Sequence, residues 1–445
     1  MKLKYYLPIL LLLSVLFVSF WNIVSNGYDK QNKYILFLKK IIPTQISRKI
    51  RDMVFIIPDL KTRNKFLSLQ VKKYEQGLDG QLFEEKVLQG KDKKYYLKNF
   101  FLPFPRLDFR QGWAATENSK RAHYLEIVGD KVILISGLGQ TIFFNKKNIL
   151  NKKLDQYEIL NNIKSEILQK NNFELIGIRD LFVEKDKVYI SLQFKNEKGF
   201  SINLYRANLN YSKLNFELFF ETHEYWPIYN VYSGGRIEKF KNNKILFSIG
   251  YSYVKGAAQD KNSLLGKIIS IDTNSGKHEL ISLGHRNQQG LIFVDASDLI
   301  INSEHGPMGG DEINFNFLKE EQLPNFGWDI SSYGIEYDGT DPYKRSHKDY
   351  GFKEPFKYYV PSIGISEIIY LNKSISPAKK NILFISSLRA GSLYELELDK
   401  DLTKVLSENR IYFGNERIRD IEYDQENNAI FILFEYTPSI AVLKL

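Results

Sequence analysis

The sequence predicts an all-β protein made of six similar units. From about residue 120 onward, short apolar runs are separated by turn residues, which is typical of β-strands rather than helices. In six places the chain repeats a strand, a polar turn and a second, more apolar strand, with starts about 53 to 57 residues apart except for one interval of about 76. The six repeats begin at His123, Gly177, Gly234, Gln289, Ile365 and Ile418. This period is typical of a six-bladed β-propeller, whereas a pair of β-sandwiches would not give such regular spacing.

Further strands complete several of the six units. They are KGFSINLYRANLN after the second repeat, GKIISIDTNSGKHELISL after the third and AGSLYELELDKD after the fifth. The last unit stops after three strands, at SIAVLKL, and would leave an unpaired sheet edge. We therefore predict that a strand from residues 95–118 completes this blade, so that the propeller spans residues 95–445.

The first residues of the chain form an uncharged apolar segment, Tyr5 to Val24. Twenty helical residues span roughly 30 Å, which is the thickness of the hydrocarbon core of a bilayer. A cleaved signal peptide is the alternative, but no clear cleavage site follows. We predict an uncleaved membrane anchor within residues 1–28, with the bulk of the protein on the extracytoplasmic (periplasmic) side.

Residues 29–94 alternate apolar stretches with basic clusters, which predicts short amphipathic helices broken at Pro43 and Pro58. These helices could equally lie on the membrane or pack on the main domain. The chain carries a net charge of +10, and this basic excess lies within residues 1–100. A membrane surface explains that distribution better than nucleic acid, which we exclude as a partner.

The composition excludes several classes of site. The chain has no cysteine, so disulfides, iron–sulfur clusters, thiolate zinc sites and cysteine nucleophiles are ruled out. It also lacks a dinucleotide-binding glycine motif, a phosphate-binding loop, a zinc-protease motif and a serine-hydrolase elbow.

One stretch has a composition that fits neither a helix nor a strand. SEHGPMGGDEIN, residues 303–314, combines three glycines and a proline with a histidine and three acids. Such a backbone must turn sharply and approach another group closely. The stretch follows GHRNQQGL, in which an Arg-Asn pair enters a predicted inner strand, and it precedes NFGW.

Together these segments resemble the soluble aldose dehydrogenases that depend on pyrroloquinoline quinone, the glucose/sorbosone dehydrogenase family of six-bladed propellers. The family signature runs G-x-R-N-P-Q-G-L, S/T-E-H/Q-G-P, D-E-I-N and N-Y-G-W. This chain has GHRNQQGL, SEHGP, DEIN and NFGW, with Gln288 in place of the proline and Phe326 in place of the tyrosine. The resemblance continues through SSLRAGSLYELELD and ERIRDIEY and covers roughly residues 120–445.

The resemblance implies a set of roles around a tricarboxylate quinone and a calcium ion (Ca2+). The backbone carbonyls of Gly306 and Pro307 would face the calcium. Arg286 and Asn287 would point at the quinone oxygens and stabilise charge that develops there. The residues expected to pair with the cofactor carboxylates are Arg389, Arg417 and Arg419. Those expected to brace the loop are Asp311, Glu312 and Asn314.

The chain departs from the family at the catalytic base. The family has a histidine in H-x-G-G-R or H-x-S-G-R, whereas VYSGGRI places Tyr232 at that position and Val231 where an aspartate often stands. A phenol, with an ordinary pKa of about 10, is a poorer base at neutral pH than an imidazole at about 6.5. Arg286 and calcium would favour the phenolate.

The sequence therefore predicts a quinoprotein dehydrogenase that oxidises an aldose sugar or a related alcohol by hydride transfer to pyrroloquinoline quinone. Tyr232 and Arg286 are the predicted catalytic residues, and a membrane acceptor would receive the electrons. The alternative is a non-catalytic propeller that binds a glycan or a protein at the cell surface.

Overall fold

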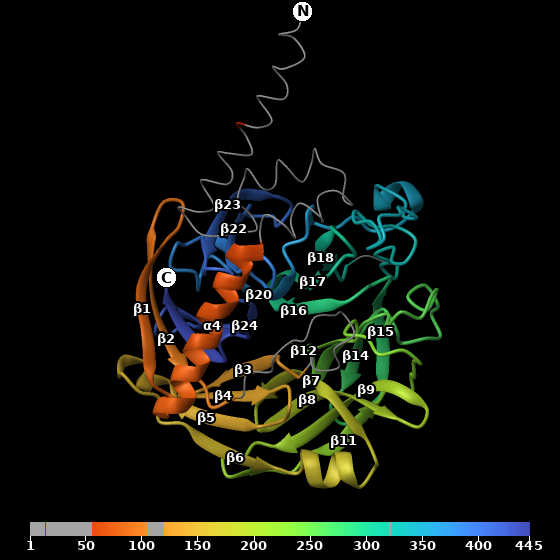
Figure 1. Ribbon diagram of the computed structural model, residues 1–445. Helices are drawn as coiled ribbons and strands as arrows, with labels where there is room; N and C mark the ends of the chain where they lie inside the picture. Colours follow the sequence, from red (N-terminus) through yellow and green to blue (C-terminus); the bar gives the residue numbers. More distant parts are fainter. Residues whose placement is uncertain (1–13, 15–55, 105–119, 320–321) are drawn as a thin grey trace, which may run out of the picture.

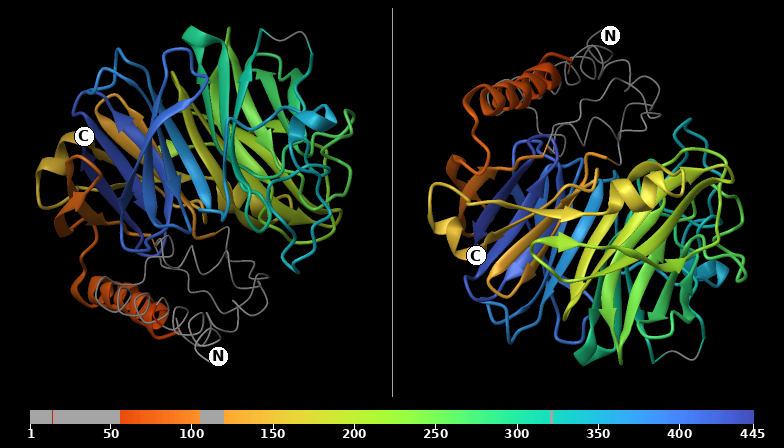
Figure 2. Two further views of the ribbon diagram at one scale, coloured as in Figure 1. Left: turned by 90° about the horizontal axis from the view of Figure 1, so that it is seen from above. Right: turned by 90° about the horizontal axis from the view of Figure 1, so that it is seen from below.

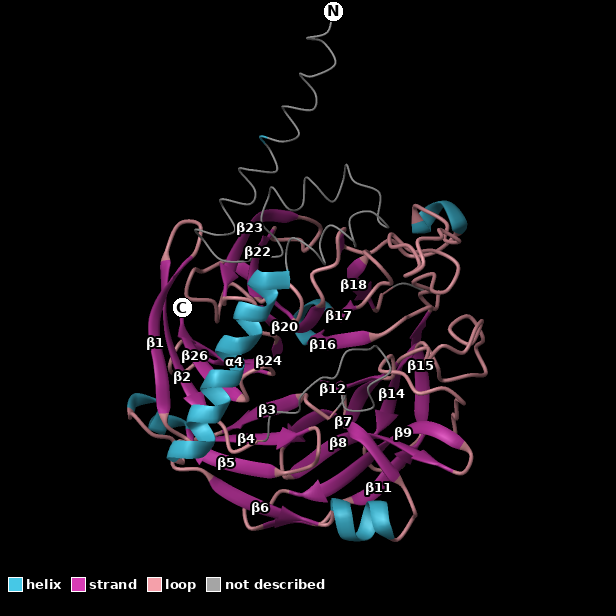
Figure 3. Ribbon diagram, viewed as in Figure 1, coloured by secondary structure: helices cyan, strands magenta, loops and turns pink. Residues whose placement is uncertain are grey.

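Six β-sheets form a ring, as Figure 1 shows, and the axis that their innermost strands surround is here called the channel. The computed structural model describes residue 14 and residues 56–104, 120–319 and 322–445. Strands dominate this part of the chain (Figure 3), and each sheet forms one blade. The innermost strands of neighbouring blades contact each other all the way around, including the last with the first. The prediction of a six-bladed propeller is confirmed.

The six sequence repeats form the two innermost strands of the six blades. These strands are apolar and almost wholly buried because each sheet packs against a neighbour on both faces. The innermost strands are β3 (His123–Val128), β7 (Glu174–Glu184), β12 (Gly234–Phe240), β16 (Gln288–Val294), β20 (Ile365–Leu371) and β24 (Ile418–Asp424). The second strands are β4 (Lys131–Ser136), β8 (Lys187–Asn196), β13 (Lys244–Ile249), β17 (Leu299–Glu304), β21 (Asn381–Ser387) and β25 (Ala429–Phe434).

The outer strands complete the blades by antiparallel pairing, apart from the two-residue β10, which adds a parallel pair to the first blade. The long interval between the fourth and fifth repeats contains the connection between β18 and β19, which the structure describes at residues 318–319 and 322–356. The outer strands are β5 (Thr141–Asn145), β6 (Tyr157–Asn161), β9 (Gly199–Asn208), β10 (Lys213–Leu214), β11 (Glu217–Glu221), β14 (Lys267–Asp272), β15 (His278–Leu283), β18 (Asp311–Phe317), β19 (Lys357–Tyr359), β22 (Ser392–Leu398), β23 (Val405–Tyr412) and β26 (Ser439–Lys444). Short helical turns are η1 (Lys146–Leu150), η2 (Ile163–Gln169), η3 (Asp295–Ser297) and η4 (His347–Tyr350).

The last blade combines strands from distant parts of the chain. β2 (Lys94–Phe101) pairs antiparallel with β26, from Tyr96 opposite Lys444 to Phe101 opposite Ser439. It lies at the start of the segment expected to complete this blade, and residues 105–119 lie outside the described residues. β1 (Leu82–Gln89) adds a fifth strand, although the sequence predicts helix up to residue 94. A turn at residues 90–93 folds β1 back onto β2, and this pairing outweighs the helical pattern.

One helix, α4 (Ile56–Gln76), precedes these strands and lies on one face of the propeller (Figures 1 and 2). Pro58 does not break it, because Pro58 lies in the first turn, where backbone N–H groups have no partner within a helix. The helix packs on the last blade, where the ring of Phe66 stacks on Tyr436 with 5.3 Å between centroids. The sequence left open whether this region lies on a membrane or packs on the main domain. Helix α4 packs on the main domain.

The predicted membrane segment, Tyr5 to Val24, and the predicted break at Pro43 lie outside the described residues. Within the part of the chain that the structure describes, no helix is both long and apolar enough to cross a bilayer.

Acidic side chains gather below the mouth of the channel. Arg236 bridges three strands: its Nη1 lies 3.0 Å from Asp180 Oδ1, its Nη2 lies 3.0 Å from Asp420 Oδ1, and it also pairs with Glu367. Three more glutamates extend the group along the channel. Burial and neighbouring carboxylates raise the pKa of each, to about 8 for two of them. These glutamates are Glu126, Glu238 and Glu422.

We expect the free energy of unfolding to fall as the pH rises from about 5 to about 8. Glu238 has a pKa of about 8 in the folded protein, above its ordinary value, so the folded state binds its proton more tightly than the unfolded state. The stabilisation is complete below the ordinary pKa and is lost as the carboxyl ionises. Glu238→Gln should reduce this loss by about 1–3 kcal/mol in denaturant titrations at the two pH values. Glu217→Gln, at an exposed site on β11, is the control; equal slopes in both variants would contradict the expectation.

Candidate functional site

Five of the residues expected at the site gather at one mouth of the channel. The innermost strands run in the same direction, so the residues at their N-terminal ends meet at the same rim. Tyr232 precedes β12, Arg286 and Asn287 precede β16, and Arg417 and Arg419 flank the start of β24. The fold therefore collects side chains from the third, fourth and sixth blades.

Arg286 is buried and its side chain is directed into the glycine-rich loop. Its Nη1 donates to the carbonyl oxygens of His305 at 3.0 Å and Gly306 at 2.8 Å. Three aromatic rings, here called the aromatic cage, surround the guanidinium: Tyr232 at 4.5 Å, Trp328 at 5.1 Å and Tyr251 at 5.9 Å from the ring centroids. A guanidinium is well stabilised between ring faces and carbonyl oxygens, so Arg286 remains charged in a buried position.

Two buried acids hold the loop at residues 303–314. Glu304 accepts from the backbone N–H of Arg286 at 2.6 Å and from Asn314 Nδ2 at 2.6 Å. Asp311 accepts from the N–H of Gly364 at 2.7 Å and that of Gly306 at 3.3 Å. A Cβ at position 306 would lie 2.1 Å from the carbonyl oxygen of Gly310, so only glycine fits there. The loop turns sharply to place its carbonyl groups against Arg286.

The carbonyl expected to face calcium is therefore engaged by a cation of the protein itself. The guanidinium of Arg286 lies 2.8 Å from the Gly306 oxygen, and a divalent cation there would be repelled by it. Pro307 packs against Gly334, whose added Cβ would lie 2.8 Å from the proline ring. Across the described ranges, no group of three or more histidine, aspartate and glutamate side chains could hold a metal ion. These residues do not fit the calcium ion that the resemblance implies.

Three arginines at the mouth share one carboxylate. Glu435, which follows β25, is buried and lies 2.6 Å from Arg417 Nε, 2.6 Å from Arg419 Nε and 3.0 Å from Arg121 Nε. Burial alone would raise its pKa, but the three guanidinium groups hold the pKa of Glu435 well below its usual range. We call Arg121, Arg417, Arg419 and Glu435 the arginine cluster. Its net charge is positive, so it fits an anionic ligand with more than one carboxylate.

A chain of side chains connects the arginine cluster with the aromatic cage. Arg419 Nη1 donates to Gln289 Oε1 at 2.8 Å, and Gln289 Nε2 donates to Asn287 Oδ1 at 3.2 Å. Asn287 Oδ1 also accepts from the N–H of Gly234, two residues after Tyr232, at 3.3 Å. Arg389 is exposed in the loop between β21 and β22, at the same rim. A single ligand at the mouth could therefore contact both groups.

Sequence reasoning missed Glu435, Arg121 and Gln289. Gln289 lies inside the recognised GHRNQQGL motif, so its position was a usable signal. Glu435 follows an apolar strand in the ordinary segment FILFEYTP, and Arg121 precedes the first repeat. Neither has a local pattern that marks it.

His305 lies near both the aromatic cage and the arginine cluster, but it is poorly suited to act as the catalytic base. Burial lowers the pKa of His305 to about 4, and the nearby charges of Arg419 and Arg286 act in the same direction. The imidazole of His305 is therefore neutral at physiological pH and is a weak proton acceptor. That Tyr232 stands where the family has its histidine stays a prediction from the motif VYSGGRI.

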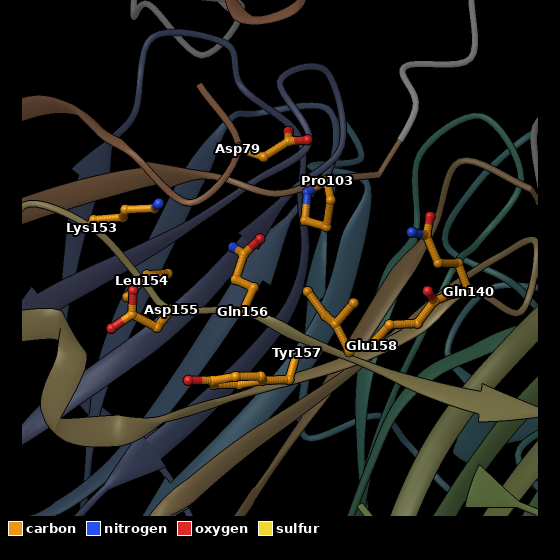
Figure 4. Close-up of a pocket in the computed structure, with 10 residues that line it drawn as sticks. Asp79, Pro103, Gln140, Lys153, Leu154, Asp155, Gln156, Tyr157 and Glu158 are labelled. Atoms are coloured by element: carbon orange, nitrogen blue, oxygen red, sulfur yellow. The ribbon is translucent and has the colours of Figure 1, made fainter. Parts of the chain in front are cut away.

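A separate pocket lies away from this mouth. It has a volume of about 460 Å³ and lies at the outer edge of the first blade, as Figure 4 shows. Its lining shares no residue with the aromatic cage or the arginine cluster. The lining residues are Asp79, Pro103, Gln140, Ile142, Lys153, Leu154, Asp155, Gln156, Tyr157 and Glu158.

Comparisons with known proteins agree with this fold and these motifs. An aldose sugar dehydrogenase of Escherichia coli K12 is 28% identical over 203 residues, which cover 42% of this chain and 53% of the relative. The chain spans between about half and two thirds of the length of the first curated relatives that it matches.

Solved structures show the same propeller fold. A glucose dehydrogenase structure superposes with a TM-score of 0.61 at 22% identity, over 74% of this chain and 97% of that chain. The pyrroloquinoline-quinone-bound form of an aldose sugar dehydrogenase from Streptomyces coelicolor superposes with a TM-score of 0.53 at 17% identity, over 80% and 98% of the two chains. The sequence profile of the glucose/sorbosone dehydrogenases matches residues 165–440, more than half of the chain. The protein therefore belongs to the glucose/sorbosone dehydrogenase family.

Proposed function

We propose that this protein oxidises an aldose sugar or a related alcohol, with pyrroloquinoline quinone as the electron acceptor. The observation that carries the proposal is the arginine cluster, in which three guanidinium groups share the single carboxylate of Glu435 at the mouth of the propeller. A tricarboxylate fits that surplus of positive charge. Family membership supports the reaction class, since the relative in Escherichia coli is an aldose sugar dehydrogenase.

Different residues of the chain would bind the cofactor and transfer the proton. Arg417, Arg419 and the exposed Arg389 would hold the carboxylates of the cofactor, while Asn287 and Arg286 would lie near the quinone oxygens. When bound, the quinone supplies the carbon that accepts a hydride from the substrate. Calcium does not fit beside Arg286, and no step is assigned to it.

Tyr232 would take the proton. As the hydride leaves the substrate carbon, the hydroxyl on that carbon loses its proton to Tyr232 Oη and a carbonyl group forms. The substrate thus loses one proton, to the phenolate, and one hydride, which carries both electrons to the quinone. A redox carrier must then reoxidise the cofactor; we propose a membrane carrier on the extracytoplasmic side. A non-catalytic propeller that binds a glycan or a protein is less favoured, because it leaves the arginine surplus unexplained.

We expect the purified protein to bind pyrroloquinoline quinone equally well in chelator and in millimolar calcium. The reason is that Arg286 already occupies the Gly306 carbonyl. Arg419→Gln should weaken binding at least about 10-fold, because a charge-assisted hydrogen bond contributes about 1.5–3 kcal/mol. Quenching of tryptophan fluorescence during quinone titration gives both affinities.

Arg206→Gln is the matched control, because this arginine donates to the carbonyl of Thr273 on the outer part of a blade, away from the mouth. Binding that requires calcium would contradict the exclusion of the metal while leaving the cofactor in place. No binding under either condition would contradict the proposed function itself.

A further inference from the structure

Helix α4 lies over the same mouth as the arginine cluster. The last blade is antiparallel, so β25 ends at the rim where β24 begins, and β2 ends where β26 begins, with Phe101 opposite Ser439. The segments that follow these two strand ends carry Tyr436 and Phe104, and both contact α4 on that face of the propeller (Figures 1 and 2). The helix lies outside residues 165–440, which match the family profile, so its part in the site cannot be carried over from the family motifs.

Two contacts fix α4 against this rim. The ring of Phe66 stacks on that of Tyr436 at 5.3 Å, and the guanidinium of Arg417 lies 5.8 Å from the centroid of the same Tyr436 ring. Two turns further along the helix, Lys73 Nζ donates to the carbonyl oxygen of Phe104 at 3.1 Å. The first contact joins the helix to the arginine cluster through a single aromatic ring.

Gln70 lies between these two anchors on the same stripe of the helix. Residues 66, 70 and 73 follow the spacing that places side chains on one helical face. Gln70 is 4% exposed, whereas Val71 and Tyr74 are 52% and 60% exposed. The side chain of Gln70 is therefore directed at the rim of the propeller and not at solvent.

The amide of Gln70 has unused hydrogen-bonding capacity. Within the described residues, neither Oε1 nor Nε2 of this side chain has a hydrogen-bond partner. A buried amide without partners is destabilising, and each such group in a folded protein requires an explanation. A leucine would fill the same position without that cost, so the amide points to a function that an apolar side chain cannot serve.

The region beneath α4 is positively charged. The arginine cluster has a net positive charge, and the ammonium of Lys73 adds to it; its side chain is 1% exposed, and its partner Asp79, at 3.2 Å, is 54% exposed. Burial lowers the pKa of His123, at the start of β3, to about 4, and the charges of Arg419 and Lys73 act in the same direction against that of Glu435. The helix and the cluster thus act on one region, which favours an anion.

We propose that Gln70 is a further ligand-binding residue of the mouth, whose Nε2 donates a hydrogen bond to a carboxylate of the anion that the arginine cluster holds, with α4 as the roof of the site. The donor is already desolvated in the ligand-free protein, so its desolvation adds nothing to the cost of binding. The ligand is a polycarboxylate, and its identity as pyrroloquinoline quinone rests on the proposed function. Citrate tests the same contact without a quinone.

The test compares the native protein with Gln70→Leu, which removes both amide atoms from the helix. Quenching of tryptophan fluorescence measures the affinity for pyrroloquinoline quinone, and calorimetric titration measures that for citrate. Both affinities should fall at least about 10-fold, because a hydrogen bond to a charged group is lost. The denaturant midpoint should not fall, since the variant removes a buried unpaired amide, whereas a merely structural role would lower it.

Two further variants keep the test decisive. Gln76→Leu is the matched control, because it makes the same substitution at an exposed position of the same helix and should leave both affinities unchanged. Gln70→Glu retains the shape of the side chain and replaces the donor with a negative charge, so it should weaken both anions at least as much as Gln70→Leu does.

The outcomes separate this inference from the proposed function. Unchanged affinities in Gln70→Leu, or an equal loss in Gln76→Leu, overturn the inference while quinone binding and the proposed function stand. The expected losses in a protein that turns over no sugar support the inference and contradict the proposed function. A native protein that binds neither anion overturns both.

Discussion

Replacing Glu435 with alanine should lower the free energy of unfolding by about 3–5 kcal/mol. Removal of this carboxylate leaves three largely buried guanidinium groups without the counter-charge that they share, and an uncompensated buried charge is among the most destabilising changes in a protein. Denaturant titration of the native protein and the variant measures the difference. Glu397→Ala is the control, because it breaks an exposed pair with Lys380 and should cost less than about 1 kcal/mol.

The same variant should be stabilised by added polycarboxylate more than the native protein is. Citrate or pyrroloquinoline quinone can place a carboxylate where that of Glu435 stood, and binding to the folded state alone raises the unfolding temperature. A larger shift in Glu435→Ala than in the native protein would identify the arginine cluster as an anion site. A variant that loses no stability would show that the three arginines do not depend on Glu435.

Tyr232→Phe should lower kcat by about 100- to 10,000-fold and leave quinone affinity unchanged. The substitution removes the proposed proton acceptor and keeps the ring that stacks on Arg286, and general base catalysis contributes an effect of this size. The native protein should be slow near neutrality and faster as the pH rises, because the phenolate is the reactive form. A panel of aldoses and alcohols assayed between about pH 6 and 10 measures the profile.

Tyr232→His is the informative counterpart, because it restores the residue type found in the family. Its activity should appear at lower pH than that of the native protein, as expected for an imidazole. Full activity in Tyr232→Phe would show that another group takes the proton. In that case His305, which lies near Arg286 and Arg419, would be the next residue to replace.

The sequence predicts the six inner hairpins because a propeller imposes one period on all blades. A hairpin buried on both faces must be apolar, and this constraint is visible in one dimension. Residues at the mouth could be predicted from the sequence for a different reason, because Arg286 and Gly306 lie in a contiguous motif. Strand β1 was not predicted, since its exposure on the outer edge of the last blade weakens the alternation of apolar and polar residues.

The arginine cluster could not be predicted for a physical reason. Arg121 and Glu435 lie on different blades, more than 300 positions apart, and meet only because the ring closes. The contact between Arg286 and the Gly306 carbonyl could not be predicted either, because a sequence motif does not specify the side-chain rotamer of an arginine. Residue types predicted which groups reach the mouth, and only the packed fold determines which of them bind each other.

The pairing of β2 with β26 sets the order in which the chain can assemble during synthesis. β2 leaves the ribosome early, but its partner is made more than 300 residues later, so the last blade remains incomplete while five others can form. Bringing two such distant segments together is entropically costly and slow. Ring closure is therefore expected to be the final and rate-limiting event of folding. The mouth, which needs Arg121 from one side of that seam and Arg417 and Glu435 from the other, can take up its ligand only after the seam has closed.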